Sequence, residues 1–445
     1  MEVVADLHLH SKYSRAVSPE MIIPNMVKWA KIKGINLMGT GDFTHPLWLK
    51  ELKEYLNEDK GILNFQKGDE SSVKFLLTGE ISSIYSQAGK TRKIHNIVIA
   101  PSFLVVEKLN QELKNRGCNL MSDGRPIISL SARDLLDLVL SIDKNCLLIP
   151  AHIWTSWFSL FGSKSGYDSI EECFGNLSKY IYAIETGLSS TPAMNWQIKD
   201  LDSRRILSFS DAHSPANLGR EATVLEIEKL GYKEIKEAIT GIGGKIANTV
   251  EFYPEEGKYY YTGHRNCGIK QTPEETEKLG TTCPVCGKPL TVGVMHRVMQ
   301  LSSHKEQSTE NSLRARSEAS KVHRDNFGVR WIEKESRPPY VSLVPLREII
   351  AEVKGVGKLA KGVEEEYQKL ITVLGSELSI LLKVKTEEIS KAGGEKLAEG
   401  IAKVRQGDIC INPGFDGEYG MVKIWSDKKD AIAKEKNEQT SLFVN

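Results

Sequence analysis

Short apolar runs recur through the first 250 residues, and each is followed by polar positions and then by a segment with helical spacing. The runs span residues 3–9, 35–40, 73–78, 94–100, 146–150, 180–184 and 206–210, and the helical candidates between them are 24–33, 48–57, 132–142 and 192–202. Alternation of strands and helices is typical of α/β folds. We therefore expect a mainly parallel α/β sheet in this half of the chain.

Side chains that bind metal ions lie at or beside the end of every one of these runs. They are His8 and His10, Asp42 with His45, Glu80, His95, His152, Glu185, and Asp211 with His213. One such residue is usually a cap or a surface residue, but seven runs with the same feature weaken that explanation. In a closed barrel of parallel strands, the C-terminal ends converge on one face and carry the chemistry. The pattern predicts a polynuclear metal site at a barrel mouth.

The mixture of imidazoles and carboxylates indicates which ions this site would take. Such a set suits Zn²⁺, Mn²⁺ or Fe²⁺, and a central carboxylate, for which Glu80 is the best candidate, can bridge two ions. Clustered ions of this kind activate water and stabilise charge at phosphorus. We interpret the first half as a metal-dependent phosphoesterase.

The middle of the chain carries a second ligand pattern. His264-x2-Cys267 is followed, after fifteen residues, by Cys283-x2-Cys286. Two tight pairs at this separation predict a tetrahedral Cys3His zinc site of the structural type. Whether the basic residues around it contact DNA or face water stays open.

The last part of the chain is mainly helical in pattern, and its final twenty residues are polar. Helical patterns follow residues 340–346, the last of them at 395–404, and Gly355-x-Gly357 interrupts two of them. Such a turn can hold a phosphate, although a plain connection between helices is the commoner case. Residues 426–445 have little to bury and are expected to be disordered.

Composition indicates an ordinary soluble globular protein. The net charge of +1 excludes a global basic field for nucleic acid, and no apolar run has the length of a membrane span. Seven cysteines form no pattern of secreted disulfides. We expect a cytoplasmic, nucleoid-associated monomer without a membrane partner.

Several of these motifs resemble a known superfamily. Asp6-Leu-His-Leu-His-Ser11, Gly39-Thr-Gly-Asp42, Gly79-Glu80, His95, His152 and Ser210-Asp-Ala-His213 resemble the polymerase-and-histidinol-phosphatase (PHP) superfamily. The resemblance implies a distorted seven-stranded (β/α) barrel with up to three metals. One ion would take His8, His10, Glu80 and Asp211, a second would share Glu80 and add His95 and His152, and a third would use Asp42 and His213. The superfamily often has a further histidine where this chain reads Ser11–Ala16, so His45, Glu185 or water would complete the third site.

A narrower resemblance covers residues 1 to about 425. Gly41-Asp-Phe-Thr-His-Pro46, Pro150-Ala-His-Ile-Trp-Thr155 and Glu185-Thr-Gly-Leu-Ser-Ser190 are similar to endonuclease Q. The resemblance implies a DNA repair endonuclease that nicks DNA 5′ of deaminated bases (uracil, hypoxanthine, xanthine) and abasic sites through attack of metal-activated water. The catalytic residues would be His8, His10, Glu80 and Asp211. The cofactors would be Zn²⁺, with Mn²⁺ or Mg²⁺ as options in the active site.

Two further sets of residues are candidates for contacts with DNA and with a protein partner. The aromatic segment after His152 is either a core loop or a pocket for an extruded base, which would use Trp154, Phe158, Ser189, Ser190 and Asn195. At the C-terminus, Gln439-x-Ser-Leu-Phe443 resembles the pentapeptide by which bacterial proteins dock on the sliding clamp, with Gln439, Leu442 and Phe443 as anchors.

The expected organisation has four parts. Residues 1–250 form the barrel, 251–330 the zinc module with a flexible segment, 331–425 a helical region that contacts DNA, and 426–445 a disordered tail. A small-molecule phosphatase of the histidinol-phosphate type is the alternative, although it hardly requires the last 190 residues. A non-catalytic clamp-associated module is the third and weakest reading, because the ligand set is nearly complete.

Overall fold

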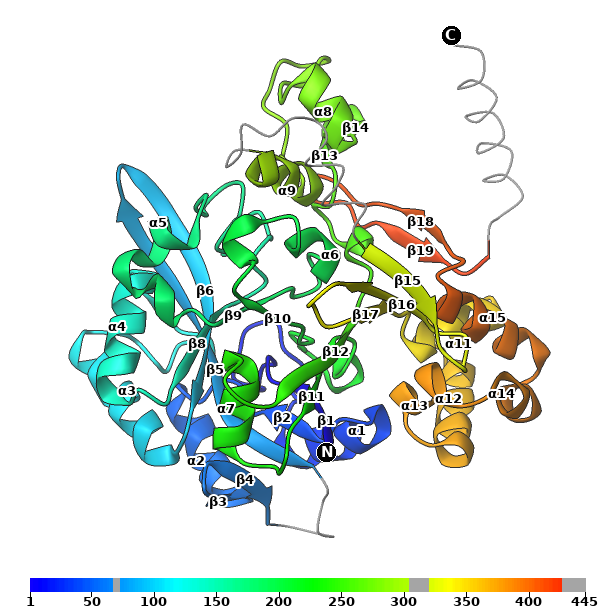
Figure 1. Cartoon of the computed structure of the whole chain (residues 1–445), viewed down its shortest axis with the longest axis horizontal. Helices are drawn as coiled ribbons and strands as arrows, with labels where there is room; N and C mark the ends of the chain where they lie inside the picture. The colour runs from blue at the N-terminus through cyan, green and yellow to red at the C-terminus, as the bar shows by residue number, and fades with distance from the viewer. Residues whose placement is uncertain (67–72, 304–319, 426–445) are drawn as a thin grey trace.

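The computed structural model describes residues 1–66, 73–303 and 320–425. Within these ranges, thirteen strands form one mixed sheet, and a helical unit lies at its side (Figure 1). The sheet runs in the order β15-β16-β17-β12-β11-β1-β2-β5-β4-β3, with β6 and β7 paired to β5 and β8 paired to β6. Sequence reasoning therefore identified the α/β class and the helical C-terminal region.

The strands near the site combine both directions of pairing. β1 (Glu2–Asp6), β2 (Leu37–Gly39) and β5 (Lys74–Gln87) are parallel neighbours, whereas β11 (Ala222–Glu226) is antiparallel to β1 and β6 (Lys90–Ala100) is antiparallel to β5. The expectation of a mainly parallel sheet was wrong. The reason is local: Ala88 and Gly89 both adopt positive φ, 50° and 73°, which closes β5 and β6 into one long hairpin.

Three strand ends are brought beside the end of β1 by contacts outside the main sheet. β9 (Ala183–Glu185) and β10 (Arg205–Leu207) pair in parallel as a separate ribbon. An isolated parallel bridge joins Leu9 to Ala212, and the Ile153 N–H, beyond β8 (Leu147–Pro150), donates to the Glu185 carbonyl at 3.2 Å. Closure of seven strands into a barrel stays a prediction.

Most of the expected helices form where the apolar spacing placed them. They are α1 (Ile23–Lys33), α2 (Pro46–Tyr55) and α4 (Ala132–Ile142), joined by α3 (Phe103–Asn115) and α7 (Tyr232–Thr240). The helix expected over 192–202 is instead α6 (Pro192–Asn195) followed by the 3-10 turn η2 (Lys199–Leu201). The Asn195 side chain donates to the Thr191 carbonyl at 2.9 Å, and such bonds compete with helix propagation.

The second half adds a small module and a helical unit to this sheet. The module contains β13 (Thr262–His264), the 3-10 turn η5 (Arg265–Cys267), β14 (Ile269–Gln271), α8 (Pro273–Leu279) and α9 (Val294–Ser303). β15 (Ser320–Arg324), β16 (Arg330–Lys334) and β17 (Tyr340–Ser342) then extend the central sheet through pairing of β17 with β12 (Lys245–Glu251).

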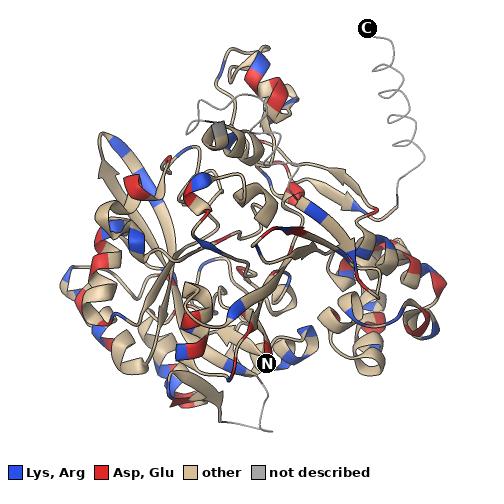
Figure 2. Ribbon diagram, viewed as in Figure 1, with Lys and Arg blue, Asp and Glu red and all other residues tan. Residues whose placement is uncertain are grey.

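The C-terminal helices have a core of their own against the sheet. They are α11 (Leu346–Lys354), α12 (Lys361–Leu374), α13 (Glu377–Leu382), α14 (Thr386–Gly393) and α15 (Glu395–Gln406), followed by the hairpin of β18 (Cys410–Asn412) and β19 (Met421–Lys423). Their buried faces pack with Ala222 and Val250 of the sheet. Basic and acidic positions are interspersed on these helices, as on α3 and α4, which agrees with the small net charge (Figure 2).

Candidate metal centre and adjoining cavity

His8, His10 and Asp211 form the first group of potential ligands. Their ligand atoms all lie within 4.8 Å of one another. His10 Nε2 is 3.1 Å from Asp211 Oδ1, and His8 Nε2 is 3.7 Å from the same oxygen. The Leu9–Ala212 bridge is the cause, because it aligns the segment after β1 with the segment after β10.

Glu80, His95 and His152 form the second group, again with ligand atoms within 4.8 Å of one another. Glu80 Oε1 is 2.6 Å from His95 Nδ1 and 3.1 Å from His152 Nε2. The antiparallel register of β5 and β6 pairs His95 with Ser82, two residues from Glu80, and so brings Glu80 and His95 close together although fourteen residues lie between them in the chain. His152 lies two residues after the end of β8, with a φ of 30°.

The Glu80 carboxylate connects the two groups. While Oε1 faces His95 and His152, Oε2 lies 3.3 Å from His10 Nε2 and 3.7 Å from His8 Nε2. A carboxylate in this position can reach ions held by both groups, and the bridging role expected for Glu80 stays a prediction. Burial opposes ionisation of Glu80, but its interactions with His95 and with the Arg125 guanidinium hold its pKa well below the usual range.

Arg125 was not predicted from the sequence. Its Nη1 donates to Glu80 Oε2 at 3.1 Å, which places a guanidinium at the edge of both ligand groups. The preceding Gly124 passes so close to Asp42 and Ser14 that a Cβ there would meet Asp42 Oδ2 at 2.3 Å. Nothing in the sequence marks an arginine in a loop as part of a site.

Glu185 contacts two of the proposed ligands. Its carboxylate lies 2.8 Å from His8 Nδ1 and accepts the His152 backbone N–H at 2.8 Å, and it is completely buried. The sequence left open whether Glu185 is a ligand or an orienting residue. With His8 Nδ1 directed to Glu185, the Nε2 atom is left facing the other groups, which is how carboxylates usually orient metal-binding histidines.

Asp42 holds His10 in the same way. Asp42 Oδ1 is 3.0 Å from His10 Nδ1, while Oδ2 accepts bonds from the Ser11 and Ser14 hydroxyls at 2.6 and 2.9 Å. Ser14 lies in the segment where the PHP superfamily often has a further histidine. Among the described residues, the groups of three or more potential ligands contain neither Asp42 nor His213.

The other two histidines near this edge have different surroundings. The His213 ring centroid is 4.8 Å from that of His10, and its Nδ1 is 2.8 Å from the Asp211 carbonyl oxygen. His45 stacks on Tyr13 at 4.4 Å, and its Nε2 lies 3.3 Å from the Met121 carbonyl oxygen. The third metal site therefore stays a prediction.

A second observation, which does not depend on residue type, also indicates that this site fits divalent ions. His8 Nε2 is buried without a hydrogen-bond partner, although it faces the carboxylates of Glu80 and Asp211. A buried polar atom without a partner is costly, and a cation between these groups would remove that cost.

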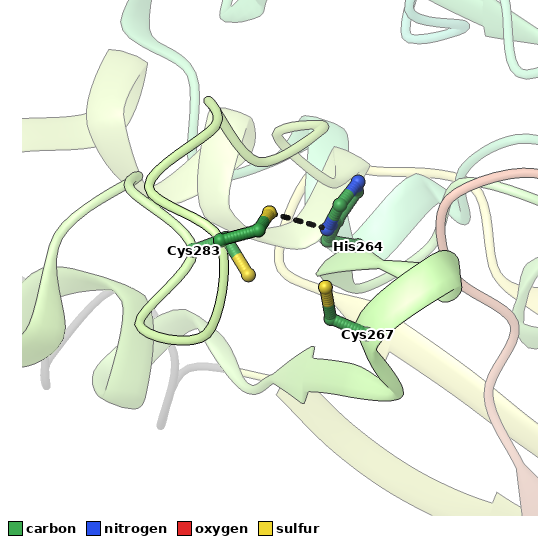
Figure 3. A group of neighbouring side chains, drawn as sticks. His264, Cys267 and Cys283 are labelled. Carbon is green, nitrogen blue, oxygen red and sulfur yellow. Dashed lines mark hydrogen bonds between the residues drawn. The ribbon is translucent and has the colours of Figure 1, made fainter.

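The four residues of the predicted zinc site also come together. His264 ends β13, Cys267 ends η5, and Cys283 and Cys286 lie on the loop that follows α8, with all four ligand atoms within 4.8 Å. Figure 3 shows His264, Cys267 and Cys283 directed to a common point. Desolvation opposes ionisation of Cys283, but backbone N–H groups of Cys286 and Val285 lower the pKa of this thiol to about 6, whereas desolvation and the neighbouring thiols raise the pKa of Cys267 to about 11. A thiolate at neutral pH is the form that binds zinc.

Most of the residues predicted for a base pocket lie in the protein core. The Trp154 indole donates to Asn195 Oδ1 at 2.7 Å, and Asn195 donates to the Ser190 hydroxyl at 3.1 Å; all three side chains are buried. They satisfy one another and are not free for a ligand. The Phe158 ring is 4.7 Å from the His95 ring, so it packs on a proposed ligand.

A cavity of about 300 Å³ opens beside the ligand groups instead. Its walls include His152 and Asp211, together with Leu188, Ser189 and Tyr259. Of the residues predicted for a base pocket, Ser189 lines this cavity. The pocket-forming tyrosine comes from a distant segment of the chain, and for that reason sequence reasoning missed it.

The remaining predicted residues, Gln439, Leu442 and Phe443, lie outside the described residues. In the part of the chain that the structure does describe, no helix combines the length and the apolar character needed to cross a membrane. A mixed α/β scaffold that gathers histidines and carboxylates in two adjoining groups beside a cavity is typical of phosphodiester hydrolases that bind metal ions.

Comparison with solved structures identifies the family within this class. The crystal structure of a lesion-specific endonuclease from Pyrococcus furiosus is 32% identical, with a TM-score of 0.79, and the match covers 97% of this chain and 99% of that chain. The structure of endonuclease Q bound to a 27-mer duplex with an abasic lesion at the active site is 33% identical, with a TM-score of 0.78, and the match covers 97% of this chain and all of that one. The chain belongs to the endonuclease Q family.

Sequence comparisons extend the relationship. Residues 345–408 match the model of the MJ0043 C-terminal domain. The Bacillus subtilis protein YqxK is 29% identical over 441 residues, which are 95% of this chain and 99% of that protein. The Methanocaldococcus jannaschii protein MJ0043 is 32% identical over 289 residues, 63% of this chain, and the match spans 32% of that relative's own length.

Proposed function

We propose that this chain is a metal-dependent DNA repair endonuclease that nicks DNA 5′ of deaminated bases (uracil, hypoxanthine or xanthine) and of abasic sites. The observation that carries the proposal is the Glu80 carboxylate, which lies between the two ligand groups. One member of each group, Asp211 and His152, lines the 300 Å³ cavity. The family membership supports the same activity, because one relative of known structure holds a duplex with an abasic lesion at its active site.

In this proposal the chain's own residues hold two ions at one centre. His8, His10 and Asp211 would hold one ion, His95 and His152 would hold a second, and Glu80 would contact both. Zn²⁺, Mn²⁺ or Mg²⁺ bound there would activate water and neutralise charge that develops on the phosphate. Asp42 and His213 are the proposed ligands of a third ion.

Three buried or half-buried side chains would orient the ligands of this centre or balance their charge. Glu185 and Asp42 fix the rings of His8 and His10 through their Nδ1 atoms. Arg125 contributes a permanent positive charge beside Glu80, and its guanidinium is partly exposed at the edge of the site. An anionic phosphodiester that enters the site would be attracted to that charge.

The cavity beside His152 and Asp211 would receive the damaged nucleotide. Enzymes that inspect a base inside a duplex must first unstack it and rotate it out of the helix. Ser189 offers a hydroxyl, Leu188 and Tyr259 offer apolar surface, and the cavity volume of about 300 Å³ lies at the lower end for small-ligand sites. An abasic site would enter at lower cost, since it has no base to unstack.

We further propose that His264, Cys267, Cys283 and Cys286 bind a structural zinc ion. The thiolate character of Cys283 and the convergence of all four ligand atoms support this assignment. In the same way, we propose that the enzyme is a cytoplasmic monomer that acts on nucleoid DNA and docks on the sliding clamp through Gln439, Leu442 and Phe443.

The proposed activity is tested with end-labelled duplexes that carry one uracil, hypoxanthine, xanthine or abasic site, with Mg²⁺, Mn²⁺ or Zn²⁺ present. Wild-type protein should nick 5′ of the lesion, and Asp211→Ala should reduce the rate by at least about 100-fold, because a ligand of the centre is lost. The exposed Asp137 of α4 supplies the control Asp137→Asn, which should nick like the wild type.

The same assay separates the alternative function. A phosphatase of the histidinol-phosphate type would use the same metal chemistry but would release phosphate from a small monoester. Turnover of histidinol phosphate without a nick at any lesion would refute the proposed endonuclease. Full nicking by Asp211→Ala would instead refute the metal assignment.

A further inference from the structure

A second cavity, of about 700 Å³, continues from the first toward the C-terminal helical unit. The two cavities share Leu188 and Gly257, so they adjoin at these residues. We call this second cavity the interdomain groove. Its walls come from the segment 214–220 after His213, from the turn between α11 and α12, and from the β18–β19 hairpin.

Positive side chains face the interdomain groove. The Arg220 guanidinium is anchored beside the metal centre, with Nε donating to the Ser210 carbonyl at 3.0 Å and Nη2 at 3.5 Å from the Asp211 carbonyl oxygen. Lys358 lies at the far end, and its side chain is 62% exposed in a surface ion pair with Glu348. Such a pair is weak in water, so an incoming phosphate can compete for the lysine.

Two acidic residues, Glu256 and Glu348, line the groove against the four basic residues Lys33, Arg220, Arg347 and Lys358, and Glu348 is paired with Lys358. Burial together with the neighbouring Glu348 raises the pKa of Glu256 to about 8, so it is mostly neutral at pH 7. Lys258, which lines the adjoining smaller cavity, adds a further positive charge. A polyanion is therefore the ligand that the groove complements.

An exposed aromatic ring is held at the edge of the groove. Tyr419 is 75% exposed, and Lys258 Nζ lies 4.4 Å from its ring centroid. The backbone on both sides is fixed, because the Gly417 and Gly420 N–H groups donate to the carbonyls of Lys258 and Glu256 at 2.9 and 3.0 Å. An exposed aromatic ring on a fixed backbone in a positive groove is an arrangement on which unstacked nucleotides can rest.

We propose that the interdomain groove binds the lesion strand beside the cleaved phosphate, with backbone phosphates at Arg220 and Lys358 and a base stacked on Tyr419. We assign the groove to the strand that is cut, because it adjoins the cavity lined by Asp211 and His152. The inference rests on the proposed endonuclease function and names the surface that positions its substrate.

The first test measures stacking by Tyr419 in the full-length protein. DNA affinity of Tyr419→Ala and Tyr419→Phe is compared by fluorescence anisotropy with a lesion-bearing duplex. Loss of a stacked base should weaken binding about 5- to 10-fold in the alanine variant, and phenylalanine should restore it. Tyr180→Ala is the matched control, since Lys179 lies over the Tyr180 ring at 5.3 Å on a different part of the surface. Unchanged affinity of Tyr419→Ala would overturn the inference.

The second test measures the phosphate contact. It uses a variant of Lys358, so it stays informative even if the Tyr419 variants fold poorly. Lys358→Ala should lower the slope of log affinity against log salt by about 1, and an uncharged methylphosphonate near the lesion should weaken the wild type more than this variant. Lys361→Ala is the control, because its side chain is 90% exposed and does not line the groove. Equal salt slopes for Lys358→Ala and the wild type would contradict the proposed binding of a phosphate at Lys358 in the groove. Absence of nicking by the wild type would instead refute the endonuclease itself.

Discussion

Replacement of Glu185 by glutamine tests how the metal centre is held together. The Glu185 carboxylate is completely buried and lies 2.8 Å from both His8 Nδ1 and the His152 backbone N–H. Glutamine has nearly the same shape, but it has one acceptor oxygen and one donor amide in place of two acceptors. Either the His8 Nδ1–H or the His152 backbone N–H must then face the side-chain NH₂ group of the glutamine, which is also a donor.

The size of the effect follows from these two contacts. A buried donor left without a partner costs about 1–3 kcal/mol, and the variant also loses a charge-assisted bond to His8. Removal of a carboxylate that orients a metal-binding histidine typically weakens metal affinity or activity by about 10- to 100-fold. We therefore expect the metal concentration for half-maximal nicking to rise by about 10- to 100-fold.

The assay is a metal titration of the nicking rate, combined with direct measurement of Zn²⁺ affinity by competition with a chromogenic chelator. Glu171→Gln, an exposed glutamate in α5 (Ile170–Phe174), is the matched control and should behave like the wild type. A Zn²⁺ affinity of Glu185→Gln within two-fold of the wild type would refute the orienting role. An affinity loss far beyond 100-fold would instead indicate that Glu185 is itself a ligand.

Three further outcomes are expected. Cys283→Ser should lose about one bound zinc per chain by elemental analysis and should melt at lower temperature, whereas Cys118→Ser, remote from the cluster, should keep its zinc; equal zinc content would exclude the proposed site. Burial raises the pKa of Glu251 from 4.5 to about 7 beside the similarly buried Glu221, so the stability that its bound proton provides is complete below pH 4.5 and is lost as the pH rises through 7. Urea denaturation should show that the free energy of unfolding falls between pH 5 and 8 in the wild type and falls less in Glu251→Gln. The two decreases should differ by about 1–3 kcal/mol, and parallel pH profiles would contradict this expectation. Deletion of residues 439–445 should abolish retention on an immobilised sliding clamp while short lesion duplexes are still nicked, and undiminished retention would remove the tail from that role.

Sequence alone determined the features that depend on short spacing along the chain. Potential ligands close together in the chain, such as His8 with His10 or Cys283 with Cys286, can reach one point because few backbone bonds separate them. The periodicity of apolar positions likewise placed α1, α2 and α4 within two residues of their observed ends. The choice of Glu80 as the central carboxylate followed from its position among these motifs, and the structure places it between both ligand groups.

Tertiary structure decided everything that depends on how distant segments meet. The hairpin turn at Ala88 reversed β6 and set His95 beside Glu80, while packing of the loop at Gly124 brought Arg125 to the same carboxylate. Trp154 has the aromatic character of a base pocket, yet its partner Asn195 is forty-one residues away and keeps it in the core. Local patterns report which side chains are available, but only the register of strands and the packing of loops determine which of them share a site, because those contacts join residues that are far apart in the chain.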